Sequence, residues 1–178
     1  MKKCVPINDG WLFKAGFDRS CLDESFDFAG FRPVSLPHCA AAPIEGYDGV
    51  NESSVATYMR TLALSADYDR SRLILCFGGA TSYVEVYVNG IFVTSHRGDV
   101  PFEADVSAPL RVGFENRIIL RVDSRAKLDV PLTAGVSPVP PYCGLHRGIT
   151  LKAVSGGEIA DAHVRTLFSS DEGAIDID

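Results

Sequence analysis

Carboxylates are the side chains of this sequence that could most directly carry out acid-base chemistry. They include Glu85, Asp99, Glu103, Asp105 and Asp123. Two carboxyl groups held close together can act as a proton donor and a base, or as a nucleophile and its acid. No two of these residues have a spacing that selects them as such a pair, and turns or strand surfaces are their default positions. The sequence therefore predicts no catalytic pair within this chain.

Nucleophile and metal motifs are also sparse. No Gly-x-Ser-x-Gly sequence is present, and no Cys/His pair has a supporting motif. Cys143 and His146 have the spacing of half a zinc site without a second half. We therefore expect neither a metal nor a cofactor.

The cysteines bear on the cellular compartment. They are Cys4, Cys21, Cys39, Cys76 and Cys143, an odd number of 5 without a close pair. This pattern predicts free thiols and a reducing, cytoplasmic location. Cys76 lies in the apolar run 73–77, where a buried position is expected.

Length and charge narrow the classes of function. A chain of 178 residues fits one domain with a fragment of a second, and is too short for a (β/α)8 barrel of about 250 residues. There are 17 Lys and Arg against 23 Asp and Glu, a net charge of −6 without a basic stripe, which argues against nucleic acid. No apolar run has the length of a membrane span, and none follows the basic pair near the N-terminus as in an export leader.

Strand patterns dominate the chain. The clearest covers residues 83–94, where Val84, Val86 and Val88 alternate with other residues before Asn89-Gly90 and a second apolar alternation. Because Asn-Gly tolerates the positive φ angles of a type I′ turn, this segment predicts a β-hairpin. Further strands are predicted at 11–17, 55–64, 72–77, 116–123, 146–154 and 163–168. With no helical pattern between them, we expect an all-β sandwich of the jelly-roll or Greek-key kind.

Two stretches lie outside this pattern. Residues 21–50 are rich in Asp, Gly, Pro and Ala and predict an irregular arm around one edge or end of the sandwich. Residues 158–178, after a Gly-Gly pair, predict two strands that stop in mid-pattern. We expect 1–157 to form the sandwich and 158–178 to open a second, immunoglobulin-like β domain; the alternative is that the last strands complete the first sandwich. Unpaired strand edges in 158–178 predict homo-oligomers.

Seven short motifs follow one another between about Trp11 and Val154. They are Val34-Ser35-Leu36-Pro37-His38, Ala56-Thr57-Tyr58-Met59-Arg60, Leu75-Cys76-Phe77-Gly78-Gly79-Ala80, Val86-Tyr87-Val88-Asn89-Gly90, Pro101-Phe102-Glu103-Ala104-Asp105-Val106, Glu115-Asn116-Arg117-Ile118 and Tyr142-Cys143-Gly144-Leu145-His146-Arg147. In this order they resemble the N-terminal sugar-binding domain of glycoside hydrolase family 2, which includes β-galactosidases, β-glucuronidases and β-mannosidases. The resemblance implies a galactose-binding-like jelly roll. Most of the motif residues are expected to serve folding, among them Gly78, Gly79, Asn89, Gly90 and Phe102.

The resemblance also implies a function. The catalytic carboxylates of this family lie in a barrel domain further along the chain, so this segment would be the non-catalytic domain of a retaining β-galactosidase or β-glucuronidase. Its partners would be immunoglobulin-like and barrel domains that this chain lacks, and a β-glycoside would be the carbohydrate bound by the full-length enzyme. The alternative is a stand-alone carbohydrate-binding module, or an oligomerisation or interaction domain.

The same resemblance suggests sugar-binding residues. Family members often carry an acid just before the Tyr-x-Gly-Ile-x-Arg motif, where a carboxylate accepts hydrogen bonds from sugar hydroxyls. Residues 137–141 contain no acid here, and the nearest is Asp129. The candidate sugar-binding residues are therefore Asp129, Tyr142, His146 and Arg147. Each has a structural alternative: Arg147 could tie down a neighbouring loop through bidentate bonds, and Tyr142 could anchor its own loop.

Overall fold

A computed structural model describes residues 2–40, 55–124, 144–156, 163–168 and 173–177. Two short 3-10 helices, η1 (Arg19–Leu22) and η2 (Ala66–Tyr68), accompany the strands in these ranges. The strands are β1 (Lys2–Pro6), β2 (Trp11–Ala15), β3 (Arg32–Val34), β4 (His38–Cys39), β5 (Val55–Ala63), β6 (Arg72–Phe77), β7 (Tyr83–Val88), β8 (Ile91–Arg97), β9 (Phe102–Asp105), β10 (Glu115–Asp123), β11 (Gly144–Leu145), β12 (Ile149–Val154), β13 (Val164–Phe168) and β14 (Gly173–Ile177). Within the described ranges, no helix is long and apolar enough to cross a membrane.

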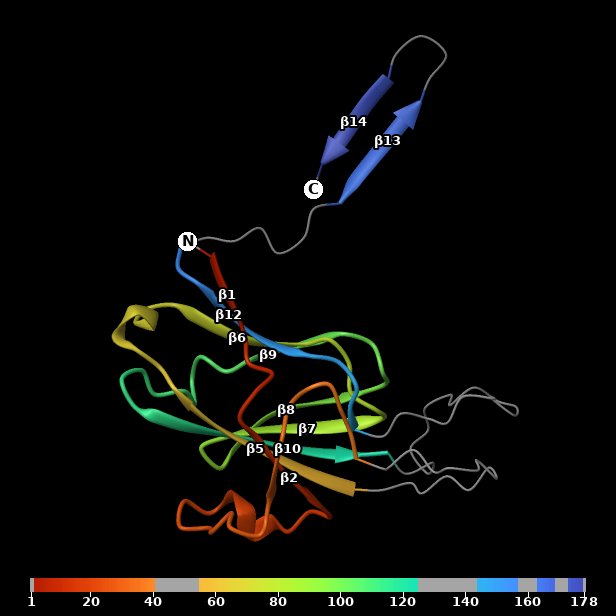
Figure 1. The fold of residues 1–178 in the computed structure, drawn as a ribbon. Helices are drawn as coiled ribbons and strands as arrows, with labels where there is room; N and C mark the ends of the chain where they lie inside the picture. The colour runs from red at the N-terminus through yellow and green to blue at the C-terminus, as the bar shows by residue number, and fades with distance from the viewer. Residues whose placement is uncertain (1, 41–54, 125–143, 157–162, 169–172, 178) are drawn as a thin grey trace, which may run out of the picture.

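Two antiparallel sheets form the sandwich, which confirms the predicted fold class (Figure 1). One sheet has four strands in the order β1-β12-β6-β9, and the other has six in the order β3-β2-β5-β10-β7-β8. Many hydrogen-bonded neighbours are far apart in the sequence, as in jelly-roll and Greek-key sandwiches. The sandwich therefore depends on long-range strand pairing.

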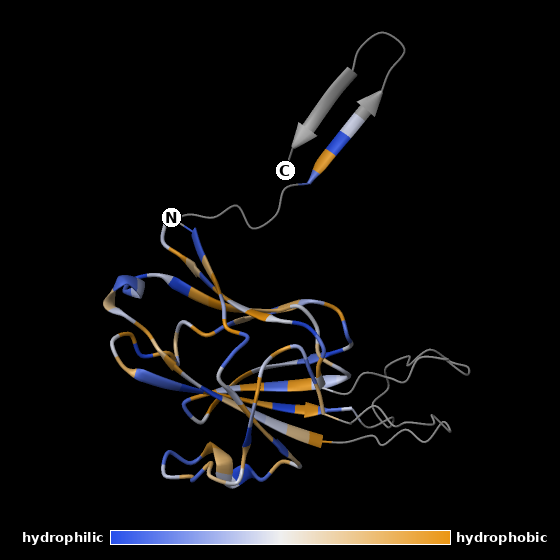
Figure 2. Cartoon of the chain, in the orientation of Figure 1, coloured by the Kyte–Doolittle hydropathy of each residue, from blue (hydrophilic) through white to orange (hydrophobic). Residues whose placement is uncertain are grey.

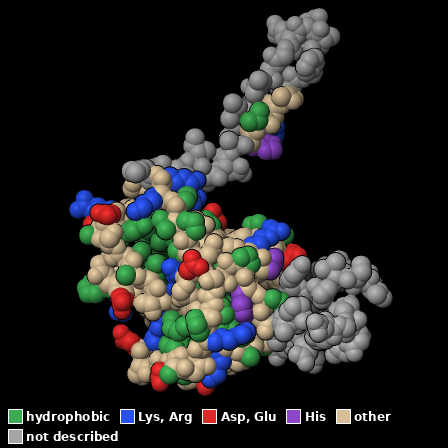
Figure 3. Space-filling view, in the orientation of Figure 1, with side chains coloured by type: hydrophobic (Ala, Val, Ile, Leu, Met, Phe, Trp, Pro, Cys, Tyr) green, Lys and Arg blue, Asp and Glu red, His purple; other side chains and the backbone are tan. Residues whose placement is uncertain are grey.

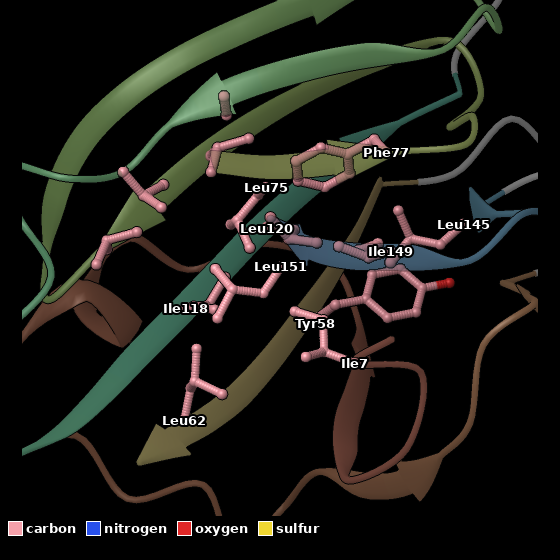
Figure 4. Packing of buried hydrophobic residues seen from close by; sticks show 14 of the residues in the cluster. Ile7, Tyr58, Leu62, Leu75, Phe77, Ile118, Leu120, Leu145, Ile149 and Leu151 are labelled. Carbon is pink, nitrogen blue, oxygen red and sulfur yellow. The ribbon is translucent and has the colours of Figure 1, made fainter. Parts of the chain in front are cut away.

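The core lies between the two sheets and follows the period-two pattern of the strands. Val84, Val86 and Val88 of β7 are buried in it, beside Ile118, Leu120 and Val122 of β10. Leu73, Leu75 and Phe77 of β6 approach from the four-stranded sheet, and Figure 4 shows Leu75 and Phe77 with Leu120 and Leu151. Along the strands, hydrophobic and hydrophilic residues alternate in Figure 2. This alternation turns one face of each strand inward, as the sequence predicted.

The turn between β7 and β8 has the predicted geometry. Asn89 has a φ of 52° and Gly90 one of 79°, which are the two positive angles of a type I′ turn. Asn89 also donates from Nδ2 to Asn116 Oδ1 at 2.9 Å. The turn is thus held to the start of β10 as well as to its own hairpin.

The described part of the arm lies at an edge of the six-stranded sheet, where β3 pairs with β2, as predicted, and it also covers a face of that sheet. It includes η1, β3 and β4, and its Cys21 is buried in a second cluster with Met59, Tyr87 and Ile119. These three partners lie on β5, β7 and β10, on the face turned away from the main core. Leu22, Phe26 and Phe28 of the arm join them, as does Phe17, which precedes the arm. Burial of this second apolar face explains why the arm folds back over the sheet.

Several strand boundaries also differ from the predictions. β1 was not predicted, because its side chains are mostly exposed at the edge of the sheet and leave no apolar period. The first predicted strand ends at Ala15, since Gly16 has a φ of 85°. The strand predicted from His146 begins only at Ile149.

Cys76 corrects another expectation. It is half-buried, because Leu75 and Phe77 on either side of it face the core and turn it outward. Its Sγ lies 3.4 Å from Glu103 Oε1, and burial, followed by this hydrogen bond, raises the pKa of the thiol to about 11.

The last two strands pair with each other in a separate two-stranded sheet. Val164, in β13, is 57% exposed. Figure 1 shows this hairpin outside the sandwich. The assignment of 158–178 to a second domain remains a prediction.

Candidate functional site

One end of the sandwich, which we call the loop end, collects the motif residues. It consists of His38–Cys39, Thr81–Tyr83, Asp123–Ser124 and residues 144–148. Strand pairing brings them together. Val55 lies opposite Asp123 in the six-stranded sheet, Cys39 lies opposite Gly144 in the short β11-β4 sheet, and Thr81 forms an isolated bridge with Gly144. The described residues that flank both 41–54 and 125–143 therefore lie at this end.

His146 is half-buried in the loop between β11 and β12. Its Nδ1 lies 3.1 Å from Thr81 Oγ1, and Thr81 N donates to Gly144 O at 3.0 Å. Burial first, and the nearby Arg147 guanidinium second, lower the pKa of His146, so that the ring is neutral at pH 7. A neutral imidazole has one donor and one acceptor nitrogen.

Gly79 makes room for this ring. A Cβ atom at residue 79 would lie 2.7 Å from His146 Nε2 and 2.8 Å from Asp99 O, too close for any side chain. Figure 3 shows histidine side chains on this side of the sandwich. The Gly78-Gly79 pair that was predicted to serve folding thus determines where His146 lies.

Arg147 is exposed and makes one of the contacts that its structural alternative predicted. Its Nη1 donates to Gly78 O at 3.3 Å, and a Cβ atom at Gly78 would lie 2.9 Å from Arg147 Cβ. Among the described residues this is a single bond rather than the bidentate pair predicted, because only Nη1 lies within hydrogen-bond distance of a carbonyl there. The other N–H groups of the guanidinium can donate hydrogen bonds to acceptor oxygens at the surface.

The strand predicted at 146–154 does not include His146 and Arg147, because hydrogen bonds outside the regular strand pairing hold the chain before Ile149. Gly78 N donates to Gly148 O at 3.0 Å, and Asn8 Oδ1 accepts from Ile149 N at 2.9 Å. A Cβ atom at Gly148 would lie 2.8 Å from the same Asn8 oxygen. The regular ladder therefore begins at Ile149.

The loop end also contains a hydrogen-bonded pair, the buried Tyr58 and the half-buried His38, that the sequence did not mark as part of the site. Tyr58 Oη is 2.9 Å from His38 Nδ1, and a Cβ atom at Gly144 would lie 2.6 Å from Tyr58 Oη. Phe13 packs on the His38 ring at 4.7 Å between ring centroids. Burial, followed by the charge of Arg32, lowers the pKa of His38. Three of the seven motifs, those of His38, Tyr58 and Gly144, meet at this point. In the sequence, the only sign of this contact is that each of the three residues belongs to a motif.

The remaining two candidates cannot be placed. Asp129 and Tyr142 lie outside the described residues, as does Cys143. Of the four predicted site residues, the structure therefore places two, His146 and Arg147, which are neighbours in one loop. Thr81 was missed because a threonine between two strands carries no chemical signal of its own.

Chemically, the described part of the loop end offers hydrogen bonding. It presents the Arg147 donors and the half-buried, neutral His146 ring, which the buried Thr81 hydroxyl contacts. In the described ranges, no group of three or more His, Cys, Asp or Glu residues could hold a metal ion. These groups suit recognition of hydroxyl and carbonyl oxygens.

The fold is that of a known class of β-sandwich domain. The protein superposes on a Bacteroides uniformis β-glucuronidase with a TM-score of 0.81 and 21% sequence identity, covering 99% of this chain and 22% of that one. A putative β-galactosidase from Bacteroides fragilis gives a TM-score of 0.75 at 23% identity, covering 99% of this chain and 28% of that one.

Sequence similarity shows the family. Residues 24–152 match the sugar binding domain of the glycosyl hydrolases family 2, and the chain belongs to this family. It is 30% identical over 162 residues to a β-galactosidase of Thermoanaerobacter pseudethanolicus, covering 89% of this chain and 22% of that protein. It is 26% identical over 187 residues to a β-glucuronidase of Paenibacillus borealis, covering 93% and 31%. The chain thus spans between a fifth and a third of the length of these relatives.

Proposed function

We propose that the chain is the non-catalytic sugar-binding domain of a longer β-glycosidase of the β-galactosidase or β-glucuronidase type. The observation that carries the proposal is the family match over residues 24–152, together with relatives of which this chain spans about 22%. In this proposal the loop end faces the catalytic domain and borders the site where a β-glycoside binds.

The geometry of the loop end supports this role. Tyr58, Gly144 and Thr81 are buried, and they hold the strand ends in one arrangement. His146 and Arg147 lie above them at the surface. A rigid base with polar groups at its rim can fix segments around a substrate pocket without taking part in bond cleavage.

The proposal is tested first by an activity assay. The purified 178-residue chain is incubated with nitrophenyl β-galactoside and nitrophenyl β-glucuronide. We expect no release of nitrophenol, because hydrolysis with retention needs two carboxyl groups about 5 to 5.5 Å apart across the glycosidic bond. Turnover that persists through rigorous purification and follows the protein peak would overturn the non-catalytic role.

A second test uses the longer enzyme. Arg147→Met is placed in the full-length protein, with Arg70→Met, whose side chain is 93% exposed, as the matched control. If the loop end borders the substrate site, Arg147→Met raises KM or lowers kcat at least several-fold, while the control leaves both unchanged. Equal kinetics for the two variants would count against a loop end that faces the substrate site.

A further inference from the structure

A polar cleft lies at the other end of the sandwich. It has a volume of about 300 Å³ and is lined by Glu24, Thr61, Asn89, Arg111, Glu115, Asn116 and Arg117. Glu115 begins β10 and Asp123 ends it, so the cleft is about 26 Å along the strand from the loop end. It is therefore separate from the residues described above.

One wall of the cleft is held by a buried amide. Asn116 Oδ1 accepts from Arg111 N at 2.7 Å, and its Nδ2 donates to Arg111 O at 2.8 Å and Phe114 O at 3.0 Å. The amide lies at 1% exposure, and its hydrogen bonds fix the turn 111–114 on the sheet. Arg111, Phe114 and Glu115 are thus placed before any ligand arrives.

The opposite wall is the arm. Arg117 Nη1 donates to Glu24 O at 3.1 Å, and Nη2 donates to Asp23 O at 2.7 Å. The guanidinium also lies 5.5 Å from the ring centroid of Phe28. Arg117 therefore uses both terminal nitrogens to fasten the arm, and it holds Glu24 beside the cleft.

Three charged side chains remain available to a ligand. The carboxylates of Glu24 and Glu115 and the guanidinium of Arg111 make no hydrogen bond or ion pair with any residue of the described ranges. Acceptors and donors thus surround the same volume. Two carboxylates disfavour an anion, and the guanidinium groups of Arg111 and Arg117 disfavour a metal cation.

The lining groups together favour a polar, uncharged ligand. Carboxylates accept and a guanidinium donates charge-assisted hydrogen bonds, so the cleft suits a ligand that carries several hydroxyl groups. A neutral sugar unit carries them, and the cleft volume of about 300 Å³ is at the lower end of the range of ligand pockets.

We propose that this cleft is a second carbohydrate site, which binds a neutral sugar unit through Glu24, Arg111 and Glu115. The proposal goes beyond the proposed function, because the cleft requires neither a catalytic domain nor the loop end. A site of this kind would attach the protein to a polysaccharide or to a remote part of a long substrate.

The test is an NMR titration of the ¹⁵N-labelled 178-residue chain. Methyl β-D-galactopyranoside and methyl β-D-glucopyranoside are added separately to 50 mM. We expect saturable shifts of the backbone amides of residues 24, 61, 89, 111 and 114–117, with a dissociation constant on the order of 1 to 10 mM for at least one of them. Shifts confined to the loop end, or no saturable shifts with either sugar, would overturn the proposal.

Variants separate the cleft from general effects. Glu115→Gln and Arg111→Met are each expected to weaken sugar binding by roughly tenfold. Their controls are Asp69→Asn and Arg70→Met, at an exposed carboxylate and an exposed guanidinium, and both should bind like the parent. The same spectra report whether each variant is folded. Unchanged affinity in folded Glu115→Gln and Arg111→Met would refute the site, as would stronger shifts with CaCl₂ or Na₂SO₄ than with either sugar.

The outcomes are independent of the proposed function. If the cleft binds no sugar, the family assignment and the proposed role of the loop end still stand. Conversely, hydrolytic activity in the isolated chain would overturn the proposed function without any bearing on the cleft.

Discussion

Tyr58 Oη and His38 Nδ1 are 2.9 Å apart, although the two residues are separated by 20 positions and come from different motifs. Tyr58 is fully buried, and burial lowers the pKa of His38, so the ring is neutral at pH 7 and can accept a hydrogen bond from the hydroxyl. A backbone position without a side chain, Gly144, lies against the same hydroxyl. The hydrogen bond therefore joins β4 to β5, and Gly144 of β11 packs against it.

Removal of the Tyr58 hydroxyl should destabilise the sandwich. Tyr58→Phe deletes the donor and leaves the half-buried His38 acceptor without it, at a cost of about 1 to 2 kcal/mol in the free energy of unfolding. Urea unfolding followed by circular dichroism measures the change. Tyr68→Phe, at a ring that contacts Lys3, is the control and should change stability by less than about 0.5 kcal/mol. Equal effects in the two variants would contradict the importance of the hydrogen bond.

Gly144 should tolerate no side chain. Its φ is 118°, and a Cβ atom would lie 2.6 Å from Tyr58 Oη and 2.8 Å from His38 O. Gly144→Ala combines backbone strain with this overlap and should lower the free energy of unfolding by about 3 kcal/mol or more. Gly113→Ala is the matched control, because residue 113 also has a positive φ, 85°, but nothing lies within 4 Å of its Cβ position. That variant should cost about 1 kcal/mol. A similar loss at both positions would mean that strain alone acts at Gly144.

Stability should fall as the pH drops below about 6.5. Burial lowers the pKa of His38 and of His146 in the folded state from the ordinary value of 6.5. The unfolded chain therefore binds protons first, and the stability that both rings contribute above pH 6.5 is lost as the pH falls through their folded-state pKa values.

His38→Asn isolates one of these two contributions. Its side-chain oxygen can still accept from Tyr58 Oη but does not titrate, so the slope of stability against pH between about 6.5 and 5 should be smaller than in the parent. Thermal unfolding at half-unit intervals of pH measures both slopes. An identical slope in the variant would exclude His38 as a source. The lowered pKa of Asp105 also makes stability fall with falling pH, but only near and below its ordinary pKa of 3.8, which is outside this window.

The last hairpin should promote self-association. β13 and β14 form their own sheet, and Val164 is 57% exposed. A two-stranded sheet has two open edges, which can pair with another chain. Light scattering should show dimers or larger species for the 178-residue chain, and a more monomeric, folded protein for a chain that ends at Ser155. A monodisperse monomer for the longer chain, with loss of folding in the shorter one, would show instead that the tail completes the first sandwich.

The sequence by itself determined the features that depend on neighbouring residues. Alternation in 83–94 predicted the hairpin and its buried face, because side chains of a strand point to opposite sides at period two. Asn89-Gly90 predicted the turn, because its positive φ angles are a local requirement. The order of the motifs was sufficient to identify the family, since each motif serves a turn or a strand of the same fold.

Only the tertiary structure decided what depends on distant residues. The meeting of His38, Tyr58 and Gly144 requires the pairing of β4 with β11, which no local pattern encodes. The position of His146 depends on Gly79 and Thr81, and the polar cleft depends on an arm fastened by Arg117. β1 escaped prediction because an edge strand needs no buried face of its own. Periodicity reports how a segment meets a core, whereas the partners that a side chain meets there are set by strand order, which arises only when the whole sandwich forms.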